Sequence, residues 1–140
     1  MRKNYYLIQL LRMMYQKIPE NADLEEFELL SVCYSNDSLQ INDSVYHPRD
    51  FYSKIKQLIE THDNYMVVFS VDDELIFGDY LFVLSEVKRA VTSLRNEFAI
   101  KNYSTEYENC DIEYEKYKFK EKLEIIQQKI PIRLIERYEN

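Results

Sequence analysis

The chain has 140 residues, 46% of them hydrophobic and 31% charged, which is the composition of a single soluble globular domain. Its one glycine excludes the glycine-rich loops that hold phosphates in P-loop and Rossmann proteins, so a nucleotide-binding enzyme of those kinds is not expected. The net charge of -7 argues against affinity for nucleic acid or anionic lipid; it leaves room for a basic protein partner and fits equally well with a merely soluble surface.

The first predicted element is a helix over residues 4–18. Its apolar residues recur at spacings of three and four and form one stripe: Leu7, Leu10, Leu11, Met14 and Ile18. We expect this stripe to dock against either the rest of the domain or a second copy of the chain, and we favour packing within the fold. Arg12 and Lys17 interrupt the apolar run, so the segment falls short of the roughly twenty apolar residues that a membrane span needs.

A β-hairpin and a second helix are predicted next. Residues 27–34 and 39–46 are rich in β-compatible residues and flank a short polar turn, which is typical of a hairpin. The sequence Asn42-Asp43-Ser44 in the second strand predicts a kink or a further turn. Pro48 is tolerated in the first turn of a helix, and the residues after it place an apolar face on one side: Phe51, Ile55, Leu58 and Ile59.

The remaining elements complete the predicted fold. A continuous apolar run predicts a buried strand at 65–71, and an acidic turn leads to a long helix from Gly78 to Glu97 and a short strand at 98–100. A last helix is expected at 119–129, and residues 132–135 predict a closing edge strand or a docked tail. The fold class is therefore α+β, with a small mixed sheet and helices packed on one face.

One domain is expected over residues 1–140. Within it we distinguish an N-terminal helix with an acidic connection (1–26), a core (27–103) and a C-terminal extension (104–140).

Candidate chemistry is sparse. Asp72 and Asp73 follow a buried strand, where ligands often bind in α/β folds, although a solvated turn favouring the next helix N-terminus is the simpler interpretation. No His or Cys stands near them in sequence to complete a metal site. His47 and His62 are expected to cap helices or lie at the surface. We therefore predict no enzyme, no metal and no cofactor.

The two cysteines are not predicted to form a disulfide framework. Cys33 lies in an apolar run and is expected to be a small buried hydrophobe, whereas Cys110 sits in a polar segment. A bond between them is compatible with an oxidising compartment, but the sequence does not place their Cα atoms within reach.

From Leu29 onward the chain resembles the extramembrane domain of the ExbD/TolR family, particularly the branch found in Bacteroidetes. The matching order is a hairpin, a helix, an apolar strand, an acidic glycine-containing turn, and a long helix with a final strand: 29–45, 51–60, 66–71, 72–79 and 80–100. Residues 92–99 resemble the helix end of that branch, and residues 127–136 are similar to its proline-containing tail.

This resemblance implies a non-enzymatic protein-binding domain in a proton-gradient-coupled system of envelope energy transduction, or biopolymer transport. It implies a homodimer at the periplasmic face of the inner membrane, with ExbB-like and TonB-like partners and peptide binding along the sheet edges. Family members carry an N-terminal transmembrane helix with a proton-handling aspartate. Residues 5–18 stand in its place without the length or any acid, so no residue inherits that role; if the chain is complete as given, we expect it in the cytoplasm.

A second hypothesis is a small acidic inhibitor or immunity-type protein that binds a basic site on a protein target. The charge of -7 suits it, as do the thirteen tyrosines, because tyrosine is enriched at interfaces; an AT-rich genome explains those tyrosines equally well. The candidate partner-binding residues are Leu7, Leu10, Leu11, Met14, Asp72 and Asp73.

Overall fold

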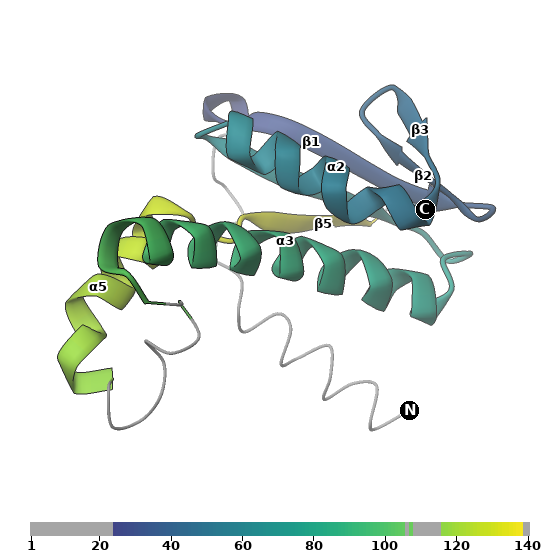
Figure 1. The fold of residues 1–140 in the computed structure, drawn as a ribbon. Coiled ribbons are helices and arrows are strands. Elements are labelled where there is room, and N and C mark those ends of the chain that lie inside the picture. The colour runs from purple at the N-terminus through teal and green to yellow at the C-terminus, as the bar shows by residue number, and fades with distance from the viewer. Residues whose placement is uncertain (1–23, 106, 108–115, 139–140) are drawn as a thin grey trace.

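The computed structural model describes residues 24–105, 107 and 116–138, and only the backbone of residues 116–119 (Figure 1). The predicted helix at 4–18, its apolar stripe and Cys110 therefore lie outside the described residues.

A five-stranded mixed sheet forms one layer of the fold. Its strands are β1 (Glu28–Ser35), β2 (Ser38–Ile41), β3 (Ser44–Tyr46), β4 (Tyr65–Val71) and β5 (Leu134–Tyr138). They lie in the order β3-β2-β1-β4-β5. Strand β2 runs antiparallel to both of its neighbours, whereas β1, β4 and β5 are parallel to one another. The predicted mixed sheet is confirmed, and its two edges are β3 and β5.

Helices form the second layer. After a short 3-10 turn, η1 (Leu24–Glu26), the described helices are α2 (Pro48–Thr61), α3 (Phe77–Tyr103) and α5 (Lys116–Lys129). Figure 1 shows α2 and α3 side by side across the same face of the sheet, and α5 beyond the C-terminal end of α3. The prediction that helices pack on one face is thus confirmed for α2 and α3.

Two tight turns shape the β1–β2–β3 meander. Asn36 and Asp37 both have positive φ, 51° and 60°, which is the geometry of the two-residue hairpin loops that suit twisted strands. Asn42 also has positive φ, 53°, and separates β2 from β3. The further turn predicted at residues 42–44 is therefore confirmed, and asparagine and aspartate stand where the backbone enters the left-handed region.

The strand predicted at 98–100 is wrong, because α3 continues through it. Ala99 is fully buried while Ile100 is 52% exposed, an arrangement that one helical face produces as readily as a strand does. Ser104 ends the helix in the left-handed conformation, and its N–H donates to the carbonyl of Ile100 (3.1 Å). The edge strand predicted at 132–135 is confirmed as β5, two residues later.

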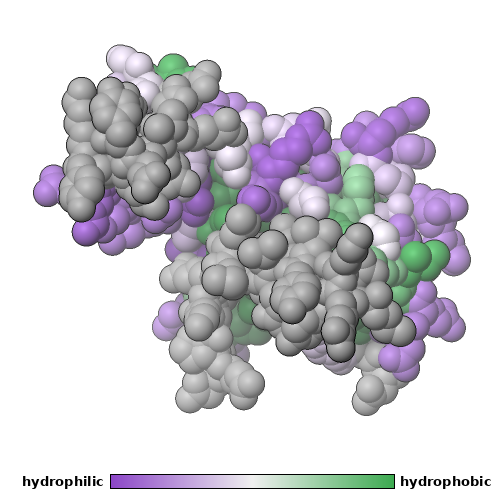
Figure 2. All heavy atoms as spheres, turned by 90° about the horizontal axis from the view of Figure 1, so that it is seen from below, coloured by the Kyte–Doolittle hydropathy of each residue, from purple (hydrophilic) through white to green (hydrophobic). Residues whose placement is uncertain are grey.

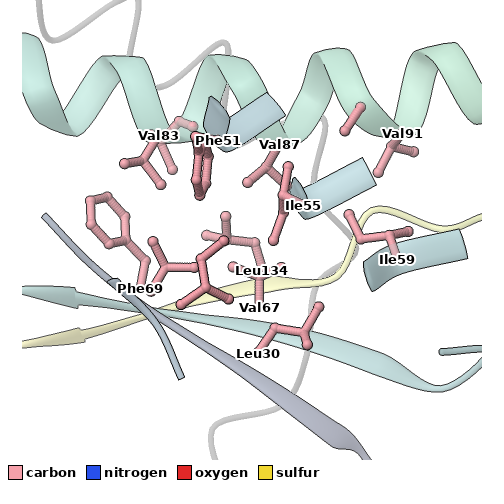
Figure 3. Close-up of a cluster of buried hydrophobic side chains, with 14 of the residues drawn as sticks. Leu30, Phe51, Ile55, Ile59, Val67, Phe69, Val83, Val87, Val91 and Leu134 are labelled. Carbon is pink, nitrogen blue, oxygen red and sulfur yellow. The ribbon is translucent and has the colours of Figure 1, made fainter. Parts of the chain in front are cut away.

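The hydrophobic core lies between α2, α3 and the sheet. In Figure 3 its side chains converge from the two helices and the sheet: Phe51, Ile55 and Ile59 from α2, Val83, Val87 and Val91 from α3, and Leu30, Val67, Phe69 and Leu134 from the strands. Of the stripe predicted on α3, Leu84, Val87, Val91 and Leu94 are buried and Leu81 is half-buried.

Strand β4 is buried on both of its faces. Met66 and Val68, on the face turned away from α2 and α3, are 0% and 1% exposed. A strand that is buried on both faces has a continuous apolar run rather than an alternating one, which is why the prediction of a strand at 65–71 matches β4. On the face that Figure 2 shows, hydrophilic residues (purple) and smaller groups of hydrophobic residues (green) are both visible.

Candidate functional site

The carboxyl ends of the three parallel strands meet at one edge of the sheet. Val71 of β4 lies opposite Tyr138 of β5, and Val32 of β1 lies opposite Phe69, so all three strands end at a common level. In open sheets with parallel strands, ligands bind outside these carboxyl ends. The turns that leave this edge are therefore candidates for a functional site.

The predicted acidic cluster follows β4 at this edge. The Asp72 carboxylate accepts a hydrogen bond from the backbone N–H of Glu74 (3.0 Å), and the Asp72 carbonyl accepts one from Leu75 (3.2 Å). Asp72, Asp73 and Glu74 are all exposed. The cluster is thus a solvated turn in which one carboxylate holds the backbone and the other two extend into solvent.

Two further acids join this edge from other segments. Asp37 lies in the β1–β2 turn, and Asp79 lies in the first turn of α3. Burial raises the pKa of the Tyr34 hydroxyl, and the negative charges of Asp79 and Asp37 raise it further. Tyr34, which packs edge-on against Phe82 at 6.2 Å, therefore lies in the negative field of both segments.

Strand β5 adds a sixth carboxylate, held by two tyrosines. The hydroxyls of Tyr80 and Tyr138 donate to the two different oxygens of Glu136, the second at 2.7 Å. The Tyr80 ring is stacked on Phe69 at 5.9 Å and on Phe77 at 6.4 Å. Because an aromatic stack fixes Tyr80, the Glu136 carboxylate is fixed as well.

Exposed apolar side chains accompany these acids. Ile76, just before α3, is 68% exposed, and Tyr138 is 66% exposed. We call this whole surface the acidic edge and define it by the residues Asp37, Asp72, Asp73, Glu74, Ile76, Asp79, Glu136 and Tyr138. Negative charge around a few exposed apolar groups suits contact with a basic protein surface.

The other residues singled out in the sequence do not join this site. His47 caps α2, where its Nδ1 accepts a hydrogen bond from the N–H of Arg49 (3.1 Å), and His62 lies at the other end of that helix within hydrogen-bonding distance of the Leu58 carbonyl (2.7 Å). Cys33 is half-buried. The stripe residues Leu7, Leu10, Leu11 and Met14 lie outside the described residues, so only Asp72 and Asp73 are placed.

Sequence reasoning missed Glu136, Tyr138 and Tyr34. Nothing local marks them, because they reach the acidic edge only when β5 and β1 pair with β4. A prediction that residues 132–138 form an alternating strand beside β4 would have placed Glu136 in this sheet. Within the described parts of the chain, no three His, Cys, Asp or Glu side chains gather closely enough to hold a metal ion.

Comparison with known proteins gives no relatives: no family model matches the chain, and neither the curated proteins nor the solved structures contain a significant match. Among the helices of the described residues, none combines the length and the apolar character that crossing a membrane requires.

Proposed function

We propose that this chain is a non-enzymatic protein-binding domain that engages a basic protein surface through its acidic edge. The observation that carries the proposal is the gathering of carboxylates from four separate segments, beside Ile76 and Tyr138, at the carboxyl ends of the parallel strands. Asp72, Asp73 and Glu74 are all exposed, so they are accessible to a partner's lysine and arginine side chains.

The two kinds of side chain have different roles in such an interface. Opposite charges speed encounter and exclude wrong partners, whereas aromatic and aliphatic anchors supply most of the binding energy. Ile76 and Tyr138 are the anchors in this proposal, and the acids around them select a basic partner. The net charge of -7 adds a long-range attraction toward a basic partner.

Of the two hypotheses from the sequence, the acidic edge favours a small acidic inhibitor or immunity-type protein that covers a basic site. The ExbD/TolR-like role in envelope energy transduction stays a prediction that rests on residue pattern alone, as do the homodimer and the ExbB-like and TonB-like partners. Its peptide-binding mode has one feature in its favour: among the described residues, no strand pairs with the outer edge of β5.

The test compares partner capture by two charge-matched triple variants. Asp72→Asn, Asp73→Asn and Glu74→Gln together remove three charges from the acidic edge. Asp43→Asn, Glu121→Gln and Glu124→Gln remove three exposed charges elsewhere and form the control. Tagged proteins would be used to isolate partners from the source cells, and each purified partner would then be titrated at several salt concentrations.

We expect the acidic-edge variant to bind the partner at least tenfold more weakly, with a smaller dependence on salt, and the control to bind as the original protein does. Equal binding by all three proteins would refute the proposal. Equal weakening in both variants would show that net charge, and not the acidic edge, attracts the partner.

A further inference from the structure

A polar groove of about 420 Å³ lies on the helix layer, away from the acidic edge. Tyr52 of α2 contributes to one wall. The other described residues that line it come from α3 at helical spacing, so they share one face of that helix: Ser85, Lys88, Arg89, Thr92, Ser93 and Asn96. These positions span about 16 Å at 1.5 Å per residue, so the groove suits an elongated ligand.

One cation of the groove is held in place. The Arg89 guanidinium lies 3.8 Å from the centre of the Tyr52 ring, and its Nη1 bonds to the Glu86 carboxylate (3.0 Å). A guanidinium that is stacked on an aromatic ring keeps its remaining N–H groups aimed in fixed directions. Arg89 therefore offers oriented donors along the groove without having to be ordered by a ligand.

The other donors of the groove have no partner of their own. No hydrogen bond or ion pair engages the ammonium group of Lys88 or the hydroxyls of Ser85, Thr92 and Ser93 in the described structure. The Asn96 carbonyl oxygen accepts from the N–H of Tyr107 (2.8 Å), which leaves its NH₂ as the donor side. A row of one ammonium, three hydroxyls and an amide is thus available to an acceptor.

Charge on this layer runs against that of the whole protein. Residues 48–61 and 77–103, which form α2 and α3, carry seven basic and five acidic side chains, although the chain as a whole has a net charge of -7. Glu86 is the only carboxylate within four residues of Lys88 along α3. The groove is therefore a local positive region on a negative molecule, which favours an anionic ligand.

We propose that this groove binds a small polyphosphate-bearing ligand, either inorganic or the phosphate chain of a nucleotide. Phosphate oxygens accept several hydrogen bonds at once and pair with both lysine and arginine, so a chain of phosphates matches a row of cations and hydroxyls better than a single carboxylate does. The proposal is independent of the acidic edge and concerns a second, oppositely charged site.

The experiment titrates the full chain with inorganic tripolyphosphate, with ATP, and with an octaglutamate peptide as a non-phosphate anion, using isothermal calorimetry at low salt. Lys88→Gln and Thr92→Val are the groove variants. Lys101→Gln is the matched control, because it removes an exposed lysine from the same helix outside the groove. Circular dichroism melting of each variant confirms that the protein is folded.

We expect tripolyphosphate to bind with one site per chain, about tenfold more weakly to Lys88→Gln, about threefold more weakly to Thr92→Val, and unchanged to Lys101→Gln. If ATP binds more tightly than tripolyphosphate, the ligand is the phosphate chain of a nucleotide. If tripolyphosphate binds more tightly than ATP, the ligand is an inorganic polyphosphate. No binding at millimolar tripolyphosphate, equal losses in Lys101→Gln, or tighter binding of octaglutamate would each overturn the proposal.

Discussion

The hydroxyl of Tyr65 accepts a hydrogen bond from the backbone N–H of Arg133 (3.1 Å) and donates one to the carbonyl of Pro131. Tyr65 is the first residue of β4, and Arg133 immediately precedes β5. The Arg133 carbonyl in turn accepts from the N–H of Val67 (3.0 Å). One phenol group, only 2% exposed, thus positions the segment that leads into the edge strand.

Replacing Tyr65 by phenylalanine should therefore destabilise the fold. The change leaves the half-buried Pro131 carbonyl and Arg133 N–H without their partner, which costs about 1–3 kcal/mol. Tyr46→Phe is the control, because the Tyr46 hydroxyl on edge strand β3 makes no hydrogen bond within the described residues. Urea denaturation measures both, and equal stability of the two variants would show that the Tyr65 hydroxyl does not hold β5.

Alkaline pH should weaken the protein through the same side chain. Burial raises the pKa of Tyr65 to about 12, against about 10 for tyrosine in an unfolded chain, although Arg133 lowers it in part. Well below pH 10 the phenol is protonated in both states. Between pH 10 and 12 the unfolded state releases its proton first, so stability falls, by about 2 kcal/mol at pH 12. In Tyr65→Phe the free energy of unfolding should fall less between pH 9 and pH 11.5 than it does in the original protein. The same pH profile in both proteins would contradict this prediction.

Asn42 should stabilise the fold through both its side chain and its backbone. Its Oδ1 accepts from the N–H of Ser31 (3.0 Å), and its own N–H donates to the Ser31 carbonyl (2.8 Å), so it extends the β1–β2 ladder by one residue. Asn42→Gly keeps the positive φ and removes the side-chain bond, at a cost of about 1 kcal/mol. Asn42→Ala adds backbone strain of about 1 kcal/mol more. A thermal melt in which alanine is the milder change would exclude this account.

The end of α3 offers a stabilising substitution. Ser104 has φ 55° and ψ 29°, where a residue with a side chain is strained and glycine is not. Ser104→Gly should raise the free energy of unfolding by about 0.5–1 kcal/mol, while Ser104→Ala should leave it nearly unchanged. A glycine that destabilises the protein would be evidence against a helix that runs unbroken to Tyr103.

Local pattern predicted most of the elements because most are marked by local chemistry. Strand β4 is a run of apolar residues between polar clusters, and α2 begins at Pro48 after a histidine cap. The error at Phe98–Ile100 arose because three apolar residues fit either a helix or a strand, and the sequence carries no glycine or proline there to decide. Only the left-handed Ser104 ends α3, and serine is not a distinctive signal for that role.

The candidate site was predictable only where it is contiguous in sequence. Asp72 and Asp73 stand out beside a buried strand, but Asp37 and Glu136 reach the same edge only through strand pairing over long separations. Asp79 joins this edge from the first turn of α3. The groove on α3 was missed for a different reason. Its polar face looks like an ordinary solvated helix surface until Tyr52 of the neighbouring helix fixes Arg89.

The placement of β5 at the sheet edge also has a consequence for how the chain folds. Strands β1 to β3 are joined by two-residue turns and can pair within microseconds. The pairing of β4 with β5 is slower, because Val67 pairs with Leu134, 67 positions further along the chain. Until β5 pairs with it, β4 exposes a long, uncharged, apolar edge. Newly made molecules are therefore most prone to aggregate before β5 pairs with β4, and chaperones would have their greatest effect at that stage.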